Sequence, residues 1–380
     1  MNLSFFKKAS IFVAMLNVSV TALANYPSSS INASLMQVMK AYHVPVVGYA
    51  IIKDNQIVSA DTLSIDPDIA VSTSSLFQAA SISKSVSAYG ALRLVSQNKL
   101  SLDKSVNNQL VTWKIPVNEY NQSTPVTLRE LLDMTSGLSV SGFPGHTQGD
   151  PLPTLLQILD GTPPANTAPI RVFYQPGTQY FYSGGGFEVL EQLIEDVMHQ
   201  SFNAWMKKEV LTSLNMQESI FEYPLEKARS KRAISGFLAD GTMIKDGWNN
   251  YAIAAAGGLW STPTDLAKFA MDITKAYHSN QGLIANKIAR QMLTRQKNTD
   301  YGLGVVIDGK GKNLNFRKSG HNLGYHNELI MFPNSGDGLV IMTDSENGEY
   351  VINYIIPRIE KEYHWPLYFP FFDELTTLPK

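Results

Sequence analysis

Residues 76–84 read Leu-Phe-Gln-Ala-Ala-Ser-Ile-Ser-Lys, which places the hydroxyl of Ser81 three residues before the amine of Lys84. Apolar residues then recur at intervals of three and four, the spacing typical of a buried helix that begins at Ser81. On a helix, residues three apart lie on one face, one turn along. A desolvated, neutral lysine can accept the proton of such a serine. The stretch therefore predicts a buried helix that carries a candidate nucleophile, Ser81, and a candidate base, Lys84.

The Ser-x-x-Lys pattern alone is weak evidence, because it occurs four times, beginning at Ser4, Ser81, Ser96 and Ser101. Ser4 lies in the N-terminal segment of residues 1–24. Ser96 straddles the expected end of the helix at Asn98, and Ser101 follows that end. Only Ser81 opens a helix, where converging backbone N–H groups favour a developing oxyanion. We therefore interpret the other three as solvated surface pairs.

A second motif, Lys318-Ser319-Gly320, is the only Lys-Ser/Thr-Gly sequence in the chain and ends a predicted strand. Glycine there allows a second backbone or a substrate to approach closely, while Lys318 supplies a cation that disfavours protonation of Lys84. The alternative is an ordinary turn at a strand end.

A third motif, Tyr182-Ser183-Gly184, precedes two further glycines at the start of a predicted helix. A tyrosine in this position would place a phenol at the mouth of a site. The alternative is an aromatic residue at the edge of the core.

The periodicity predicts an α/β (α+β) fold, an antiparallel sheet built from both chain ends and flanked by helices, with a helical insertion between. We expect residues 25–80 and 295–380 to form an α/β sandwich and residues 81–294 a mainly helical part, together one domain. The expected strands span residues 46–52, 57–58, 303–307, 314–317, 328–332 and 338–342, and a last helix spans residues 350–363.

Composition excludes several classes of protein. The 380 residues carry a formal net charge of −2 and no cysteine. A chain without a basic excess is a poor nucleic-acid partner. Without cysteine there is no disulfide, thiolate zinc site, cysteine-ligated iron–sulfur cluster or catalytic thiol. Any chemistry must therefore use oxygen and nitrogen groups.

Residues 1–24 are typical of a cleavable signal peptide. Lys7 and Lys8 precede an apolar stretch, and Ala22-Leu23-Ala24 gives the small-x-small pattern of a cleavage site. The apolar stretch is too short and too polar for a membrane anchor, and no later run is long enough to span. We expect a soluble periplasmic or secreted product.

The motifs and the segments around them resemble the serine β-lactamase-related family, which includes class C β-lactamases, D-alanyl-D-alanine carboxypeptidases and esterases. Serine and lysine on a helix, followed in order by Lys-Ser/Thr-Gly, is the signature of β-lactamases and penicillin-binding proteins. The resemblance covers nearly the whole chain after residue 24. It also includes Thr127-Leu128-Arg129-Glu130-Leu131-Leu132, Gln175-Pro176-Gly177 and Ala256-Gly257-Gly258-Leu259-Trp260.

The resemblance implies a role for each motif. Ser81 is the nucleophile that becomes acylated, Lys84 accepts its proton, and Tyr182 relays the proton to the leaving group and later activates water. Lys318 tunes this network and attracts a substrate carboxylate. The backbone N–H groups of Ser81 and His321 form the oxyanion hole, and Ser319, Gly320 and Gly184 adjoin the substrate. No metal and no cofactor are implied.

One departure concerns Gly184, which stands where family members usually carry asparagine. The carboxamide would contact both the lysine and the acylamido group of a β-lactam or peptide, so its loss argues against acylamide recognition. A class A β-lactamase is disfavoured, because no glutamate between the second and third motifs has asparagine four residues on.

Competing signatures are absent. The chain has no Gly-x-Ser-x-Gly elbow of an α/β-hydrolase and no His-Glu-x-x-His of a zinc protease. His321 and His326 lie in an expected glycine loop, where we interpret them as loop structure rather than metal ligands.

The sequence thus predicts an exported serine hydrolase that cleaves an ester or amide, such as a small ester, a D-amino-acid peptide or a β-lactam, through an acyl-serine. The alternatives are a penicillin- or peptidoglycan-binding protein with little turnover and a non-catalytic interaction scaffold. The expected partner is a small-molecule or peptidoglycan-like substrate. The oligomeric state stays open.

Overall fold

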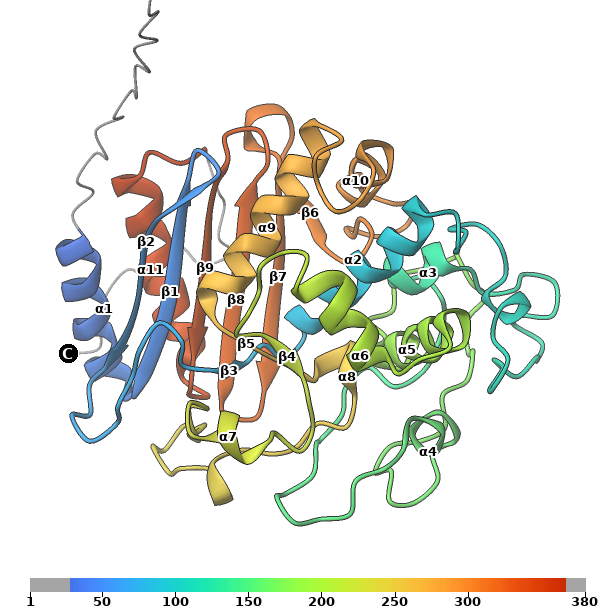
Figure 1. Cartoon of the computed structure of the whole chain (residues 1–380), viewed down its shortest axis with the longest axis horizontal. Coiled ribbons are helices and arrows are strands. Elements are labelled where there is room, and N and C mark those ends of the chain that lie inside the picture. Colours follow the sequence, from blue (N-terminus) through green and yellow to red (C-terminus); the bar gives the residue numbers. More distant parts are fainter. Residues whose placement is uncertain (1–27, 367–380) are drawn as a thin grey trace, which may run out of the picture.

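A computed structural model describes residues 28–366 of the chain. Its main sheet has six antiparallel strands in the order β2-β1-β9-β8-β7-β6 (Figure 1), so strands from both chain ends lie side by side. The expected α/β fold with a sheet from both ends is confirmed. The predicted signal peptide, residues 1–24, lies outside the described residues. The strands are β1 (Val46–Lys53), β2 (Gln56–Ser64), β6 (Val306–Asp308), β7 (Asn315–Asn322), β8 (Tyr325–Phe332) and β9 (Asp337–Thr343).

Helices cover both faces of this sheet. The helices α1 (Ser28–Tyr42) and α11 (Gly348–Glu362) pack on each other and on one face, and α9 (Pro263–His278) crosses the other face (Figure 1). Strand β1 shows the consequence, because Val47 and Ile51 join the core beneath α1 and α11 while Ala50 and Ile52 join the core on the side of α9. A strand buried on both faces has a continuous apolar sequence, as residues 46–52 do.

The mainly helical part lies beside the sheet and is centred on α2, which packs against α5, α8 and β7. Almost every residue of α2 is buried, including Ser83, Ser85 and Ser87, which explains why its sequence shows no polar face. The α-helices other than α1, α9 and α11 are α2 (Ile82–Ser96), α3 (Leu128–Leu132), α4 (Leu155–Asp160), α5 (Gly184–Met198), α6 (Phe202–Met206), α7 (Lys227–Ser230), α8 (Ala254–Gly257) and α10 (Asn286–Met292). No helix among residues 28–366 is long and apolar enough to cross a membrane.

A small second sheet joins the two parts. Its strands are β3 (Phe77–Gln78), β5 (Leu259–Ser261) and β4 (Ile220–Phe221), in the order β3-β5-β4. The chain passes from β3 directly into the turn before α2. This sheet therefore fixes where Ser81 lies, and the sequence analysis did not anticipate it because two-residue strands leave no periodicity.

Several expected boundaries were wrong. The strand expected at residues 57–58 extends over Gln56–Ser64, and the strand expected at residues 328–332 begins at Tyr325. Residues 303–305 belong to a turn rather than a strand, because Gly304 has a φ of +88° and packs so tightly on α2 that a Cβ would lie 2.3 Å from that of Ala88. Strand β7 continues through the Lys-Ser-Gly motif to Asn322, and the turn that follows is only Leu323-Gly324. The expected elements also omitted α1.

We predict that Asp265→Ala destabilises the protein by about 2–4 kcal/mol. Asp265 on α9 is 1% exposed and accepts hydrogen bonds from the N–H groups of Glu218 and Ser219 and from the Ser219 hydroxyl, just before β4. Removing the carboxylate leaves these buried donors unsatisfied. Urea unfolding measures the change.

The matched control is Asp103→Ala, because Asp103 pairs with Arg129 while its side chain is 70% exposed. An exposed pair contributes less than about 1 kcal/mol. Equal losses in the two variants would contradict the role given to Asp265.

Candidate active site

Ser81 lies in the turn that joins β3 to α2, at the edge of a cleft of about 360 Å³. The preceding residue, Ala80, has a φ of +50°, a conformation that a residue with a side chain adopts at a cost. Ser81 is partly exposed, whereas the residues on both sides of it are buried. The turn therefore presents one hydroxyl to the cleft from an otherwise buried segment.

Two side chains meet the hydroxyl of Ser81. The Nζ atom of Lys84 donates to Ser81 Oγ at 3.2 Å, and the hydroxyl of Tyr182 donates to the same oxygen at 2.8 Å. Lys84 follows one helical turn after Ser81, and Tyr182 immediately precedes the N-cap of α5, Ser183. The structure thus brings together three residues that the sequence analysis singled out separately.

Lys84 is 3% exposed, so its amine is held almost out of water. Its Nζ donates to the carbonyl oxygen of Ala256 at 2.7 Å and lies 5.1 Å from the ring centre of Tyr182. Burial lowers the pKa of Lys84 below its usual value, a shift that the nearby Tyr182 opposes and Lys318 assists. A lysine in this state is able to accept a proton.

Tyr182 lies between two lysines. Its hydroxyl accepts a hydrogen bond from Lys318 Nζ at 3.4 Å, and the Nζ atoms of Lys84 and Lys318 lie 5.1 and 5.0 Å from its ring centre. Burial opposes ionisation of the phenol, but the charges of Lys318 and Lys84 outweigh it and lower the pKa of Tyr182 to about 7. The phenol is therefore poised to take up or release a proton near neutral pH.

Lys318 lies on β7 and is as buried as Lys84, yet its pKa moves the other way. Burial acts to lower the pKa of Lys318, but the phenol oxygens of Tyr182 and Tyr301 raise it above its usual value. The pKa values of the two lysines thus move in opposite directions, and Lys318 holds its proton more firmly than Lys84. Tyr301 was missed by the sequence analysis, because it reaches Lys318 only through the turn before β6.

Gly320 allows β7 to lie against the turn that carries Ser81. A Cβ at this position would lie 2.4 Å from the carbonyl oxygen of Ala79, far inside contact distance. The neighbouring Asn327 on β8 donates to the carbonyl oxygen of Gln78 at 2.9 Å, which ties the sheet to the same segment. The close approach expected of a glycine here is what the structure has.

Ser319 and His321 alternate with Lys318 and Gly320 and have their side chains on the exposed face of β7. Asn322 pairs with Tyr325 on the two sides of the two-residue turn, and His321 pairs with His326 in the next position along the strands. Because hydrogen-bonded and non-hydrogen-bonded pairs alternate from such a turn, the N–H of His321 points away from β8. His321 also lines the cleft with Ser81, so its N–H is available to a bound group.

The expected loop position of His321 and His326 was wrong, because both lie on paired strands. Their rings stack at 4.2 Å between centres, and Nε2 of His321 lies 3.2 Å from both carboxylate oxygens of Glu346. Burial, together with the neighbouring His321, lowers the pKa of His326 to about 4. Among residues 28–366 these three form a group whose ligand atoms lie within 4.8 Å of one another.

Gly184 has no room for the asparagine that its motif position usually carries. A Cβ there would lie 2.8 Å from the ring of Phe143 and 3.1 Å from the carbonyl oxygen of Ser141. Phe143 therefore occupies this wall of the cleft and makes it apolar. The sequence showed that the carboxamide is missing but did not show which side chain takes its place.

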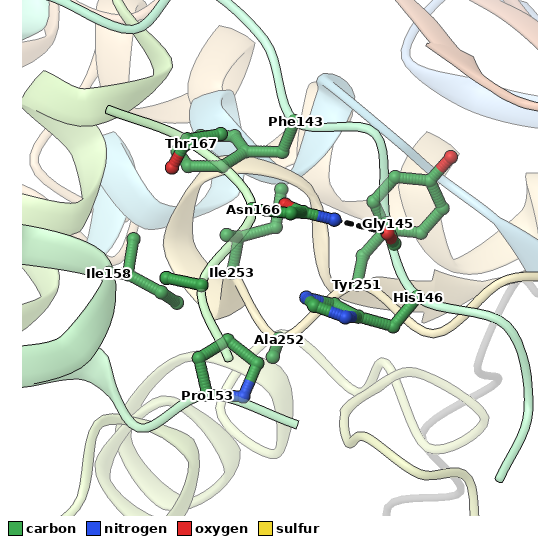
Figure 2. A pocket seen from close by; sticks show the side chains of 11 residues that line it. Phe143, Gly145, His146, Pro153, Ile158, Asn166, Thr167, Tyr251, Ala252 and Ile253 are labelled. Atoms are coloured by element: carbon green, nitrogen blue, oxygen red, sulfur yellow. Dashed lines mark hydrogen bonds between the residues drawn. The ribbon is translucent and has the colours of Figure 1, made fainter. Parts of the chain in front are cut away.

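Figure 2 shows the pocket behind Phe143, which shares Phe143, Tyr251 and Ile253 with the cleft. Its volume is only about 10 Å³, too small for a substrate group. Beside it, two backbone hydrogen bonds of 2.8 and 2.7 Å join His146 to Asn250. We interpret this region as packing that holds the loop of Phe143 in place.

Two buried glutamates of α5 bind the backbone segment that in turn binds Lys84. Glu191 accepts from the N–H of Ala255 at 2.8 Å, and Glu188 accepts from the N–H of Ala256 at 3.3 Å. Ala256 in turn supplies the carbonyl oxygen that Lys84 binds. Burial raises the pKa of both glutamates. Sequence reasoning missed this support, because a glutamate on a helix gives no sign of which backbone it will meet.

The match to known proteins agrees with this geometry. A family model described as Beta-lactamase matches residues 31–354. The chain belongs to the beta-lactamase family. The family resemblance stated from the motifs is therefore confirmed, and the fold agrees with it.

Curated relatives in this family are distant. "Protein flp" from Staphylococcus aureus (strain N315) is 22% identical over 250 residues, which cover 64% of this chain and 47% of that protein. "Penicillin-binding protein 4" from Amycolatopsis lactamdurans is 26% identical over 235 residues, 60% of this chain and 59% of that protein. The chain thus spans about half the length of the curated relatives it matches.

Solved structures of the family share the fold. The octameric penicillin-binding protein homologue from Pyrococcus abyssi has a TM-score of 0.71 at 22% identity, covering 88% of this chain and 78% of that one. The beta-lactamase/D-alanine carboxypeptidase from Yersinia pestis has a TM-score of 0.65 at 19% identity, covering 87% and 99%. At these identities the similarity establishes the fold and no more.

We predict that Gly320→Ala slows acylation of Ser81 at least about tenfold, because even a 1 Å displacement of β7 from the Ser81 turn misplaces the reacting groups. The overpacking should also cost about 1–3 kcal/mol of stability. Acylation by a fluorophosphonate, followed by mass spectrometry, measures the rate.

Gly142→Ala is the control, because a Cβ at Gly142 would meet no atom within 4 Å. We expect it to retain its folded stability and most of its rate. A Gly320→Ala protein with the wild-type rate would contradict the close approach of β7.

Proposed function

We propose that this protein is a serine hydrolase that cleaves esters or amides through an acyl intermediate on Ser81. One observation carries the proposal: Ser81 Oγ receives hydrogen bonds from Lys84 and Tyr182 at once, at 3.2 and 2.8 Å. A hydroxyl is a weak nucleophile until a neighbouring base takes its proton. Here two such bases adjoin it in a largely buried site.

The proposed reaction has two halves. In the first, Lys84 takes the proton of Ser81 while Oγ attacks the substrate carbonyl carbon, and the N–H groups of Ser81 and His321 bind the oxyanion. Tyr182 then passes a proton to the leaving alcohol or amine as its bond to the carbonyl carbon breaks. In the second half, Tyr182 takes a proton from water as the water oxygen attacks the acyl carbon, the bond from that carbon to Ser81 Oγ breaks, and Lys84 returns its proton to Ser81.

The cleft supports small substrates without an acylamido group. Phe143 fills the place where a carboxamide would bind that group, so this wall offers apolar contact instead. Lys318 supplies a fixed positive charge next to Tyr182 for a substrate carboxylate. Small esters fit this arrangement best, followed by D-amino-acid peptides and β-lactams.

A second candidate function is penicillin or peptidoglycan binding with little turnover. It is supported by the relative named Penicillin-binding protein 4 and by the homologue from Pyrococcus abyssi. Both functions begin with acylation of Ser81 and differ only in the release of the acyl group. A non-catalytic scaffold would need neither step.

We also propose that the protein is exported, with residues 1–24 removed on the way. The basic start, the apolar stretch and the small-x-small site support this. The absence of cysteine means that an oxidising compartment would add no disulfide to its stability.

Our first functional prediction is that Ser81→Ala abolishes covalent labelling by a fluorophosphonate and by a fluorescent penicillin, since it removes the attacking oxygen. Intact-mass measurement over time follows the adduct. A short-lived penicillin adduct supports the hydrolase, and a stable penicillin adduct supports the binding protein. Hydrolysis of p-nitrophenyl acetate that outpaces nitrocefin supports the preference for esters.

Ser101→Ala is the matched control, because Ser101 and Lys104 repeat the Ser-x-x-Lys spacing outside the cleft. We expect it to label like the wild type. Labelling that persists in Ser81→Ala would refute the assigned nucleophile.

A second functional prediction concerns pH. The acylation rate should rise with pH to a midpoint near 7, because the Lys84 and Tyr182 pair must lose a proton before it can accept one from Ser81, and the pKa of Tyr182 is about 7. Lys318→Met removes the charge that favours the phenolate, so the midpoint should move to higher pH. The pH profile of p-nitrophenyl acetate hydrolysis, recorded for the wild type and for Lys318→Met, measures the two midpoints.

Lys312→Met, which changes an exposed lysine of the same part of the chain, should leave the midpoint unchanged. A midpoint that stays near 7 in Lys318→Met would show that Lys318 does not set the pKa of Tyr182.

A further inference from the structure

A cluster of three potential ligands lies at the end of the β7–β8 hairpin, on the face opposite Lys318. His321 of β7 and His326 of β8 are cross-strand partners, and Glu346 follows β9. Each offers one ligand atom, and these atoms lie within 4.8 Å of one another. The reaction proposed above uses only the backbone N–H of His321 and leaves all three side chains without a role.

We propose that His321, His326 and Glu346 bind a first-row transition metal ion such as Zn²⁺. Two imidazoles and one carboxylate form a ligand set that zinc and its neighbours accept, with a fourth position open to water. The site is a property of the hairpin and does not depend on the hydrolase function. The two histidines lie on paired strands rather than in the expected loop, and their rings stack on each other.

The distances are close to those that a metal requires. Ligands at 2.0–2.2 Å from a tetrahedral ion lie about 3.3 Å apart. Nε2 of His321 and the oxygens of Glu346 already lie 3.2 Å apart. The ring nitrogen of His326 has to approach by at most about 1.5 Å to reach the same spacing.

The groups are also accessible and oriented. His321 is exposed, and His326 and Glu346 are half-buried, so an ion can enter from solvent and keep water ligands. Glu346 Oε1 accepts the N–H of Gly324 at 2.6 Å, which fixes the carboxylate beside the turn. An ion here would link β7, β8 and the segment after β9, and would restrain the hairpin end that lines the cleft.

The test uses the untagged, EDTA-treated full chain titrated with Zn²⁺ by calorimetry, with Co²⁺ as a spectroscopic probe. We expect saturable binding of one ion and a melting temperature that rises with Zn²⁺ concentration. Bound Co²⁺ should absorb visible light, and this absorption should disappear when Zn²⁺ displaces the Co²⁺. His326→Ala and Glu346→Gln should each weaken Zn²⁺ binding at least tenfold.

His321→Ala tests the same site through an exposed side chain, so that a folding defect in the other two variants does not decide the result. His43→Asn is the control, because His43 is exposed and lies outside the cluster. It should bind like the wild type. The proposal is wrong if the wild type shows no saturable Zn²⁺ binding, or if His321→Ala binds Zn²⁺ as tightly as the control.

Discussion

The hydrogen bond from Lys84 to Ser81 is the constraint on which the rest of the structure depends. An amine that must accept a proton has to be kept out of water, and yet its N–H groups need acceptors. The molecule meets both needs at once: α2 is buried on all sides, and the carbonyl oxygen of Ala256 accepts from Lys84 at 2.7 Å. Glu188 and Glu191 then hold α8, which carries that carbonyl.

The sheet supplies the opposite side of the site. Because strands from both chain ends share one sheet, β7 brings Lys318 to Tyr182, and Gly320 allows the strand to lie against the turn of Ser81. The two buried lysines then act differently. Lys84 is biased toward neutrality by burial, whereas Lys318 keeps its charge beside two phenols. A single tyrosine between them can move protons near neutral pH.

The sequence predicted the features that depend on local spacing. Ser81 and Lys84 are one helical turn apart, and the apolar runs reveal most strands of the sheet, so these follow from periodicity. Contacts between distant segments could not be predicted in the same way. Phe143 beside Gly184, Tyr301 beside Lys318 and the stacking of His321 on His326 depend on loop paths and strand register, which short-range patterns do not encode. The expected glycine loop failed for this reason, because register, not glycine content, decided the strand's end.

The most direct test of the central claim is the protonation of Lys84 itself, measured by an NMR titration of the protein with ¹³C-labelled lysine side chains. Lys84→Arg identifies its resonance by the loss of one signal. We expect this lysine to titrate below the usual lysine value of about 10.4, because burial lowers its pKa. If the signal lost in Lys84→Arg titrates together with the surface lysines, Lys84 is an ordinary cation and the proposed proton acceptor is wrong.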